Sequence, residues 1–174
     1  MNKILVVVDM QKDFVDGSLG TKEAVAIVDN VVEKIKNFDG EIFATYDTHD
    51  EDYMETSEGK HLPVPHCIKG TVGWELNAKV QEALEEKGFT PVEKITFGSL
   101  DLPIILEEYF KPEECCVELV GLCTDICVVS NALILKANYP EMPIIVDSAC
   151  CAGVTPAKHE AALEVMRSCQ IEVL

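Results

Sequence analysis

The sequence predicts a three-layer α/β/α fold built around a six-stranded parallel sheet. Short apolar runs alternate along the chain with longer segments in which apolar residues recur at helical spacing. The first apolar run, residues 4–8, is apolar on both faces, as in a strand that helices cover on both sides. Strictly alternating strands and helices favour parallel pairing through right-handed crossovers, with helices on both faces of the sheet.

The first half of the chain is predicted to form three strands and two helices. The strands are at 4–8, 41–46 and 90–95, and the helices are at 22–37 and 74–87. The first helix has its apolar residues on one stripe and ends at the helix breaker Asp39-Gly40, and the second ends at Gly88, a C-cap position. Residues 47–71 show no clear period and hold three of the four histidines. We therefore expect a long loop there, and long loops in compact domains are usually functional or disordered.

The second half of the chain continues this alternation. Helices are predicted at 102–109, 124–138 and 156–169, and strands at 115–120, 142–146 and 171–174. Pro103 lies in a first helical turn, where proline is tolerated, and Thr124 is the expected N-cap of a mainly apolar, buried helix. Residues 147–155 are rich in turn formers. No repeat or linker interrupts the pattern, so we expect a single domain over residues 1–174.

The composition narrows the classes of function. The chain has 174 residues, eight cysteines and a formal net charge of −17. A strongly acidic surface disfavours binding to nucleic acids and to anionic membranes. No apolar run approaches the length of a signal peptide or a membrane span. We therefore expect a cytoplasmic protein whose cysteines are reduced and mostly pack as small hydrophobic residues.

Reactive residues follow the ends of several predicted strands. Asp9, Asp47, Lys94 and Asp147 stand at or directly after strand ends, and Gly121 and the segment beyond it follow another strand. In sheets of this kind, ligands bind beyond the carboxyl ends of the strands. The sequence therefore predicts a site at this edge of the sheet.

Cys127 is the strongest candidate for a nucleophile. It falls in the first turn of a predicted helix, where free backbone N–H groups and the helix dipole lower a thiol pKa and can hold an oxyanion. Packing in an apolar helix explains a cysteine at this position equally well. A thiolate also needs a proton acceptor and often a cation, and Asp9 and Lys94 lie at the same edge. Taken singly, Asp9 also fits an ordinary turn residue, and Lys94 an ordinary surface lysine.

A second group of residues has the chemistry of a metal site. In Asp47-Thr48-His49 an extended backbone points both ligand side chains to one face, and His66 follows in the same loop. Two imidazoles and a carboxylate suit Zn²⁺, Fe²⁺ or Mn²⁺. A further ligand is available from the same loop, in Glu58, Glu55 or His61. The alternative is a set of surface histidines, and we assign no role to His159.

Three blocks of the chain resemble the catalytic blocks of the isochorismatase-like cysteine hydrolases. They are Val6-Val7-Val8-Asp9-Met10-Gln11-Lys12-Asp13-Phe14, Lys94, and Gly121-Leu122-Cys123-Thr124-Asp125-Ile126-Cys127-Val128. Their order and spacing fit, and the resemblance covers nearly the whole chain. Three further segments resemble the nicotinamidase/pyrazinamidase branch of this family. They are Asp16-Gly17-Ser18-Leu19, Asp47-Thr48-His49 and Pro65-His66-Cys67. The resemblance implies a Rossmann-like hydrolase domain.

The resemblance also implies a mechanism. Cys127 would attack an amide carbonyl to form a thioester, with Asp9 as its proton acceptor and Lys94 as the cation. The oxyanion would be held by the backbone N–H groups of Cys123 and Cys127, next to a cis peptide between Leu122 and Cys123. The resemblance therefore implies a cysteine-dependent amidohydrolase that would release ammonia from a small-molecule amide.

The substrate and the metal follow from the same resemblance. Asp47, His49 and His66 would hold a divalent metal, Zn²⁺ first and Fe²⁺ or Mn²⁺ as alternatives, with Glu58 as a fourth ligand. In nicotinamidases this metal binds the pyridine nitrogen. Nicotinamide or a related amide is therefore the expected substrate. The residues expected to line its pocket are Phe14, Leu19 and Phe97.

Three alternatives remain open at this stage. Pro63 stands where nicotinamidases usually place a tryptophan beside the substrate ring, which favours another small amide, a carbamoyl compound or a ureido compound. Isochorismate hydrolysis is disfavoured, because cleavage of a vinyl ether does not call for a cysteine nucleophile. A non-catalytic protein that binds metal or carries reactive thiols is the third hypothesis.

The family usually forms dimers or tetramers, so a homo-oligomer is expected, with no nucleic-acid or membrane partner.

Overall fold

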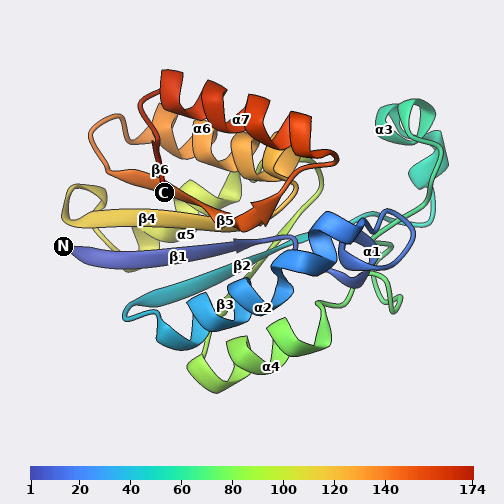
Figure 1. Ribbon diagram of the computed structural model, residues 1–174, viewed down its shortest axis with the longest axis horizontal. Helices are drawn as coiled ribbons and strands as arrows, with labels where there is room; N and C mark the ends of the chain where they lie inside the picture. The colour runs from blue at the N-terminus through green and yellow to red at the C-terminus, as the bar shows by residue number, and fades with distance from the viewer.

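The computed structural model describes all 174 residues and contains one six-stranded sheet (Figure 1). The strands are β1 (Asn2–Val8), β2 (Glu41–Asp47), β3 (Thr90–Lys94), β4 (Cys115–Leu122), β5 (Ile144–Ala152) and β6 (Glu172–Val173). They lie in the order β3-β2-β1-β4-β5-β6, and every neighbouring pair is parallel. The predicted parallel sheet is confirmed.

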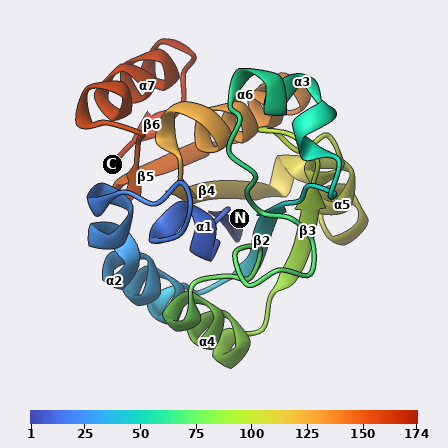
Figure 2. The ribbon, with the colours of Figure 1, turned by 90° about the vertical axis from the view of Figure 1, so that its right-hand side faces the viewer.

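Helices cover both faces of this sheet (Figures 1 and 2). The α-helices are α1 (Lys12–Val15), α2 (Lys22–Asn37), α3 (Ser57–His61), α4 (Ala78–Lys87), α5 (Asp101–Tyr109), α6 (Val129–Asn138) and α7 (Pro156–Ser168). Three short helices complete the chain: η1 (Tyr53–Glu55), η2 (Pro112–Glu114) and the π-helix η3 (Thr124–Val128). Helices α2 and α4 pack on one face, and α5, α6 and α7 pack on the other. The predicted three-layer architecture is confirmed, and no helix has the length and hydropathy that crossing a bilayer requires.

The central strand explains why the sheet is covered on both sides. Ile4, Val6 and Val8 of β1 belong to the apolar core under α5, α6 and α7, whereas Leu5 and Val7 belong to the core under α2 and α4. All five side chains are buried. Burial of a side chain of this size contributes roughly 1.5–3 kcal/mol. A strand whose consecutive residues are all apolar gains this energy on both faces only when helices cover both sides of the sheet.

Several predicted boundaries were wrong for identifiable reasons. The helix predicted from residue 74 begins at Ala78, because Leu76 forms an isolated bridge with Gln11 and Asn77 caps the helix. The loop predicted at 47–71 contains η1 and α3. Residues 147–155 were predicted as turns, yet β5 runs to Ala152, past a register shift in its pairing with β4.

The helix predicted from Thr124 also begins differently. Its first turn is the π-helix η3, and Cys123 occupies the N-cap position. The Thr124 side chain does not cap the helix, so that prediction was wrong. All eight cysteines are free thiols, and five of them are buried, as expected for small hydrophobic residues.

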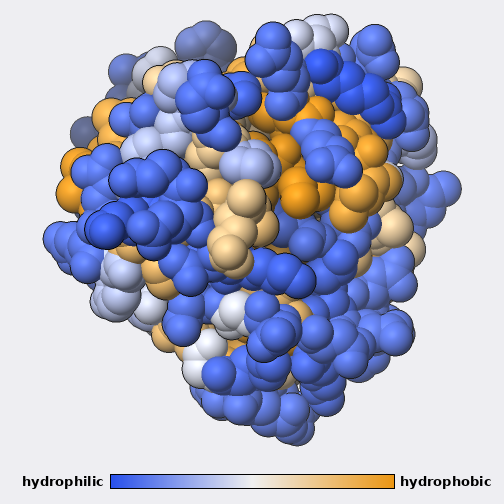
Figure 3. All heavy atoms as spheres, turned by 90° about the vertical axis from the view of Figure 1, so that its left-hand side faces the viewer, coloured by the Kyte–Doolittle hydropathy of each residue, from blue (hydrophilic) through white to orange (hydrophobic).

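Because all its strands are parallel, the sheet has an amino end and a carboxyl end. The face near the N-terminus is largely hydrophilic, with hydrophobic atoms gathered in one area (Figure 3). The strands point away from this face, toward the end where α1 and α3 lie (Figure 1). Loops at that opposite end hold the residues described next.

Candidate functional site

The residues predicted at strand ends meet at the carboxyl edge of the sheet, with one exception. Asp9 follows β1, Asp47 ends β2, Lys94 ends β3, and Cys127 lies in η3 just beyond β4. Asp147 does not join them. It lies inside β5 and pairs with Lys34 at 2.7 Å, so its assignment to this edge was wrong.

Lys94 contacts both of the other predicted members of the triad. Its Nζ lies 2.6 Å from Oδ2 of Asp9 and 3.5 Å from Sγ of Cys127, and it donates to the carbonyl of Thr96 at 3.0 Å. Burial acts to lower the pKa of Lys94. The negative groups around it, Asp9 first, outweigh this effect and raise that pKa above its ordinary value. The amine is therefore a fixed positive charge between a carboxylate and a thiol.

Asp9 is buried and held in one orientation. It is fully inaccessible and has a φ of 46°, in the left-handed region that few non-glycine residues adopt. Thr45 Oγ1 donates to Oδ1 of Asp9 at 2.6 Å and accepts from its backbone N–H at 3.2 Å. Burial raises the pKa of the Asp9 carboxyl, while the charge of Lys94 opposes the rise. A carboxylate with a raised pKa is a better proton acceptor.

Cys127 is presented by an unusual turn. The peptide between Leu122 and Cys123 is cis, as the family resemblance implied. Gly121 has a φ of 117°, and a Cβ there would lie 2.2 Å from the carbonyl oxygen of Val8, so only glycine lets β4 run this close to β1. The carbonyl of Cys123 then accepts from the N–H groups of Ile126 and Val128, which closes the π-turn.

The same turn leaves one backbone donor without a partner. The N–H of Cys123 makes no hydrogen bond within the protein. Burial, followed by the charge of Asp9, raises the pKa of the Cys127 thiol well above its ordinary value, and Lys94 opposes the rise. Burial and Asp9 thus favour the protonated thiol, and Lys94 favours the thiolate.

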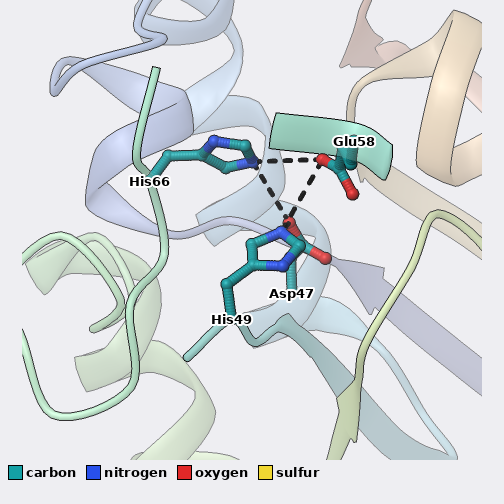
Figure 4. A group of neighbouring side chains, drawn as sticks. All are labelled: Asp47, His49, Glu58 and His66. Carbon is teal, nitrogen blue, oxygen red and sulfur yellow. Dashed lines mark hydrogen bonds and ion pairs between the residues drawn. The ribbon is translucent and has the colours of Figure 1, made fainter. Parts of the chain in front are cut away.

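The predicted metal ligands form one compact group. The ligand atoms of Asp47, His49, Glu58 and His66 all lie within 4.8 Å of one another (Figure 4). Oδ2 of Asp47 is 3.0 Å from Nε2 of His49 and 3.5 Å from Nε2 of His66. Oε1 of Glu58 is 3.7 Å from Nε2 of His49 and 3.5 Å from Nε2 of His66. Of the three acidic or histidine residues offered as an additional ligand, Glu58 is the one in this group, and Glu55 and His61 are exposed.

These distances fit a metal ion. Nitrogen and oxygen ligands at about 2.0–2.1 Å from a tetrahedral zinc lie about 3.3 Å from one another. The four distances between ligand atoms given above, 3.0, 3.5, 3.7 and 3.5 Å, bracket that value. Two imidazoles and two carboxylates are also the donor set that Zn²⁺, Fe²⁺ and Mn²⁺ accept. The residues present therefore fit a divalent transition metal.

The electrostatics of this group favour a cation. Burial acts to lower the pKa of His66, but hydrogen bonds with Asp47 and Glu58 outweigh it and raise that pKa to about 10. Burial acts to raise the pKa of Asp47, but hydrogen bonds with His49 and His66 hold it below its usual range. The carboxylates thus attract positive charge, which a proton or a metal ion supplies.

Asp47 joins the metal group to the triad. Its Oδ2 faces the histidines, while its Oδ1 lies 3.4 Å from Nζ of Lys94. Gln11, which is fully buried, clamps the backbone of Asp47: its Oε1 accepts from the Asp47 N–H and its Nε2 donates to the Asp47 carbonyl, both at 2.8 Å. One carboxylate therefore serves two neighbouring groups.

An aromatic side chain packs against the histidines. The Tyr53 ring is buried, with centroid distances of 4.8 Å to His49 and 5.0 Å to His66. Its hydroxyl donates to the carbonyl of Leu62 at 2.8 Å. Tyr53 thus fixes both imidazoles and the segment that carries Glu58.

The predicted pocket residues lie at different distances from this centre. Phe14 is adjacent, with its ring centroid 5.4 Å from that of His66. Phe97 is 43% exposed and follows Lys94 by three residues, with its carbonyl accepting from Asn131. Leu19 is half-buried on the loop after α1, where its N–H donates to Asp13, and no contact places it at the centre.

Sequence reasoning missed the residues that support the site. Thr45, Gln11 and the pair Thr124–His159 carried no spacing signal, because their partners lie 35 or 36 positions away in the sequence. Tyr53 lies only four residues after His49, but a lone tyrosine in a loop carries no signal either. Only burial of a polar side chain distinguishes them. Thr45, Gln11 and Thr124 are fully inaccessible, which a strand or helix pattern cannot reveal.

Comparisons with known proteins agree with this geometry. The family model of the isochorismatase domain matches residues 3–174. A relative from Bacillus subtilis (strain 168), named uncharacterized isochorismatase family protein PncA, is 35% identical over 177 residues, covering 94% of this chain and 93% of its own. The chain belongs to the isochorismatase family.

Solved structures place this family member near the nicotinamidases. The crystal structure of nicotinamidase/pyrazinamidase PncA from Bacillus subtilis has a TM-score of 0.85 and 28% identity, covering 99% of both chains. That of Pyrococcus horikoshii pyrazinamidase in complex with zinc has a TM-score of 0.83 and 28% identity, covering 100% of this chain and 99% of its own. The fold of this isochorismatase-family protein is the α/β fold of these enzymes.

Proposed function

We propose that this isochorismatase-family hydrolase is a cysteine-dependent amidase that cleaves the C–N bond of a small amide, with nicotinamide or a related compound as the first candidate. The observation that carries the proposal is Lys94, whose Nζ lies 2.6 Å from Asp9 and 3.5 Å from Cys127. These distances, and the burial of all three side chains, support an acceptor, a cation and a thiol that act together.

In the acylation step, Asp9 accepts the thiol proton of Cys127 as the sulfur attacks the amide carbonyl. Lys94 stabilises the negative charge that passes from the carboxylate to the thiolate. The new oxyanion accepts hydrogen bonds from the backbone N–H groups of Cys123 and Cys127. Asp9 then returns the proton to the leaving nitrogen, the C–N bond breaks, and ammonia leaves a thioester on Cys127.

In the deacylation step, Asp9 acts as the base again. It takes a proton from a water molecule whose oxygen attacks the thioester carbonyl. The C–S bond breaks, the acid product leaves, and the proton on Asp9 restores the Cys127 thiol. The proton balance closes without any other titratable group.

Asp47, His49, Glu58 and His66 would hold a divalent metal beside this centre. When bound, the ion supplies a Lewis acid that can bind a ring nitrogen of the substrate. Support comes from the fit of the four donors and from zinc in the Pyrococcus horikoshii pyrazinamidase. Phe14, next to His66, offers a flat surface for an aromatic ring.

A second candidate function is hydrolysis of a different small amide, a carbamoyl compound or a ureido compound. Pro63, at the position where a tryptophan would flank a pyridine ring, is exposed. The one tryptophan, Trp74, instead packs against Tyr46 and donates to Thr48. Neither Pro63 nor Trp74 therefore forms an aromatic pair with Phe14.

Ammonia release decides between these possibilities. The zinc-loaded protein is incubated with nicotinamide and pyrazinamide, and then with a panel of aliphatic amides, carbamoyl compounds and ureido compounds. We expect release from at least one pyridine or pyrazine amide, its loss in Cys127→Ala, and its retention in the control Cys169→Ala. Release only from non-aromatic substrates would select the second candidate, and no release from any substrate would refute the amidase proposal.

We also propose, from the family resemblance, that residues 1–174 form one domain and that this domain forms a dimer or tetramer. Light scattering after size-exclusion chromatography measures the mass directly. A mass of 19.2 kDa, that of one chain, would contradict the oligomer.

A further inference from the structure

A hydrogen bond connects the last helix to the turn that presents Cys127. Oγ1 of Thr124 and Nδ1 of His159 are 2.7 Å apart. Thr124 is fully inaccessible to solvent, and its hydroxyl makes no other hydrogen bond within the protein. His159 is half-buried on α7, which is otherwise a surface helix with an exposed outer side. A buried hydroxyl without a partner costs about 1–3 kcal/mol, so this contact is a strong constraint on the turn.

Thr124 occupies a sensitive position in that turn. It follows Cys123, whose free N–H is one of the two proposed oxyanion donors, and it is the first residue of η3, which carries Cys127. Its side chain does not cap the helix. The side-chain bond to His159 therefore fixes the first residue of the π-turn, one residue after the cis peptide between Leu122 and Cys123.

The start of α7 is packed closely enough to transmit this constraint. Oδ1 of Asp125 accepts from the backbone N–H of Val154 at 2.9 Å. A Cβ added to Gly153 would lie 2.7 Å from the backbone nitrogen of His159, so the loop before α7 and the first turn of α7 are in direct contact. Two neighbouring residues of the turn, Thr124 and Asp125, are thus anchored to the same region.

We propose that His159 is a positioning residue: through Thr124 it holds the Cys123 N–H in the orientation that receives the oxyanion. This inference rests on the proposed amidase function. Because a hydroxyl can donate to a ring nitrogen or accept from a protonated one, the contact forms in either protonation state of the ring. Loss of one oxyanion donor lowers kcat by about 10²–10³-fold, so a donor that is displaced but present should cost roughly 10–100-fold.

Three variants test this role. His159→Phe keeps a ring and removes the nitrogen, His159→Asn places an amide atom near the position of Nδ1, and Thr124→Val removes the hydroxyl at nearly constant volume. We expect kcat for amide hydrolysis to fall roughly 10–100-fold in His159→Phe and in Thr124→Val, with KM within about threefold. His159→Asn should recover most of the lost kcat, and the double variant should be no worse than the poorer single variant.

A second readout separates positioning of the oxyanion donor from other roles. Alkylation of Cys127 by iodoacetamide, followed by site-resolved mass spectrometry, needs the thiolate but no oxyanion hole. Its rate should stay within about threefold of wild type in all three variants, as should bound zinc. The matched control is Glu160→Gln, the exposed neighbour on α7, which should leave both readouts unchanged.

The outcomes are distinguishable. An active wild type with unchanged kcat in His159→Phe and Thr124→Val would overturn the inference alone. Equal losses in kcat and in alkylation rate would also overturn it, because they would assign the effect to the thiol or to folding. A wild type that hydrolyses no amide would refute the proposed function, and this inference with it.

Discussion

Lys94 compensates two buried carboxylates, and its replacement by methionine should destabilise the fold as well as abolish activity. Its side chain is 1% exposed and lies 2.6 Å from Oδ2 of Asp9 and 3.4 Å from Oδ1 of Asp47. Methionine keeps the apolar stem but leaves both carboxylates without their shared cation. Breaking a buried ion pair by removing one partner costs about 3–5 kcal/mol. For a domain of this size, each kcal/mol lowers Tm by about 2–4 °C, so the expected drop is about 6–20 °C.

The loss should depend on pH in a defined direction. The pKa of Asp9 is already raised by burial, with Lys94 opposing the rise, so removal of Lys94 raises it further. A group whose pKa is higher in the folded state than in the unfolded state binds its proton more tightly in the folded state. This tighter proton binding stabilises the folded protein at low pH, and the stabilisation is lost as the pH rises through the pKa of the folded state. The difference in unfolding free energy between wild type and Lys94→Met should therefore be smaller at pH 5 than at pH 7.5.

Urea unfolding at both pH values measures this difference in the metal-free protein. The matched control is Lys69→Met, which removes an exposed ion pair with Glu93 of the same length, 2.6 Å, and should cost less than about 1 kcal/mol. Asp9→Asn combined with Lys94→Met should recover part of the lost stability, because one uncompensated charge is gone. A cost in Lys94→Met no larger than that in Lys69→Met, or a cost that grows toward pH 5, would refute the account of Lys94 as a buried counter-ion.

Three further outcomes follow from the structure. Metal binding should release about one proton near pH 7.5, because the pKa of His66 in the metal-free protein is about 10 and its proton must leave before the metal binds. The metal affinity should rise up to about tenfold per pH unit below pH 10. Calorimetry in buffers of different ionisation enthalpy measures the released proton, and finding none would contradict this prediction. Glu58→Gln should weaken zinc binding at least about tenfold in a chelator competition while leaving Cys127 alkylation unchanged; equal affinity would exclude Glu58 as a ligand. Lys34→Met should lower the unfolding free energy by about 1–3 kcal/mol, because Lys34 bridges the partly buried Glu118 and Asp147 at 2.6 and 2.7 Å. Activity should persist in this variant, and an unchanged urea midpoint would contradict the predicted loss of stability.

Patterns of apolar residues were enough to predict most of the fold. The helix at 22–37 has the predicted bounds, because Thr21 caps its start and its buried residues recur at helical spacing. The length of β5 could not be predicted in this way. Its residues 147–152 mix charged, small and cysteine side chains, and they form a strand because β4 pairs with them across a register shift. Tertiary pairing there overrides local preference.

The candidate site divides along the same line. Asp9, Lys94 and Cys127 were found because strand ends and a helix start are visible in the sequence, and a shared sheet edge brings them together. Glu58 was one of three candidates in its loop, and only the packing of Tyr53 and α3 selects it. His159 was passed over, because a surface helix gives no sign that one of its residues reaches a buried hydroxyl 35 positions away.

Asp47 limits how this chain can be redesigned. Because the same carboxylate faces His66 with one oxygen and Lys94 with the other, a substitution of Asp47 changes the charge around both the histidines and Lys94. Under the proposed function, a descendant that acts on amides without a ring nitrogen would need no metal and could lose His49, Glu58 and His66. It would still need an anion at position 47, or a new partner for Lys94. Substrate range can therefore be altered more freely at the two histidines and Glu58 than at the residue that joins them to the thiol.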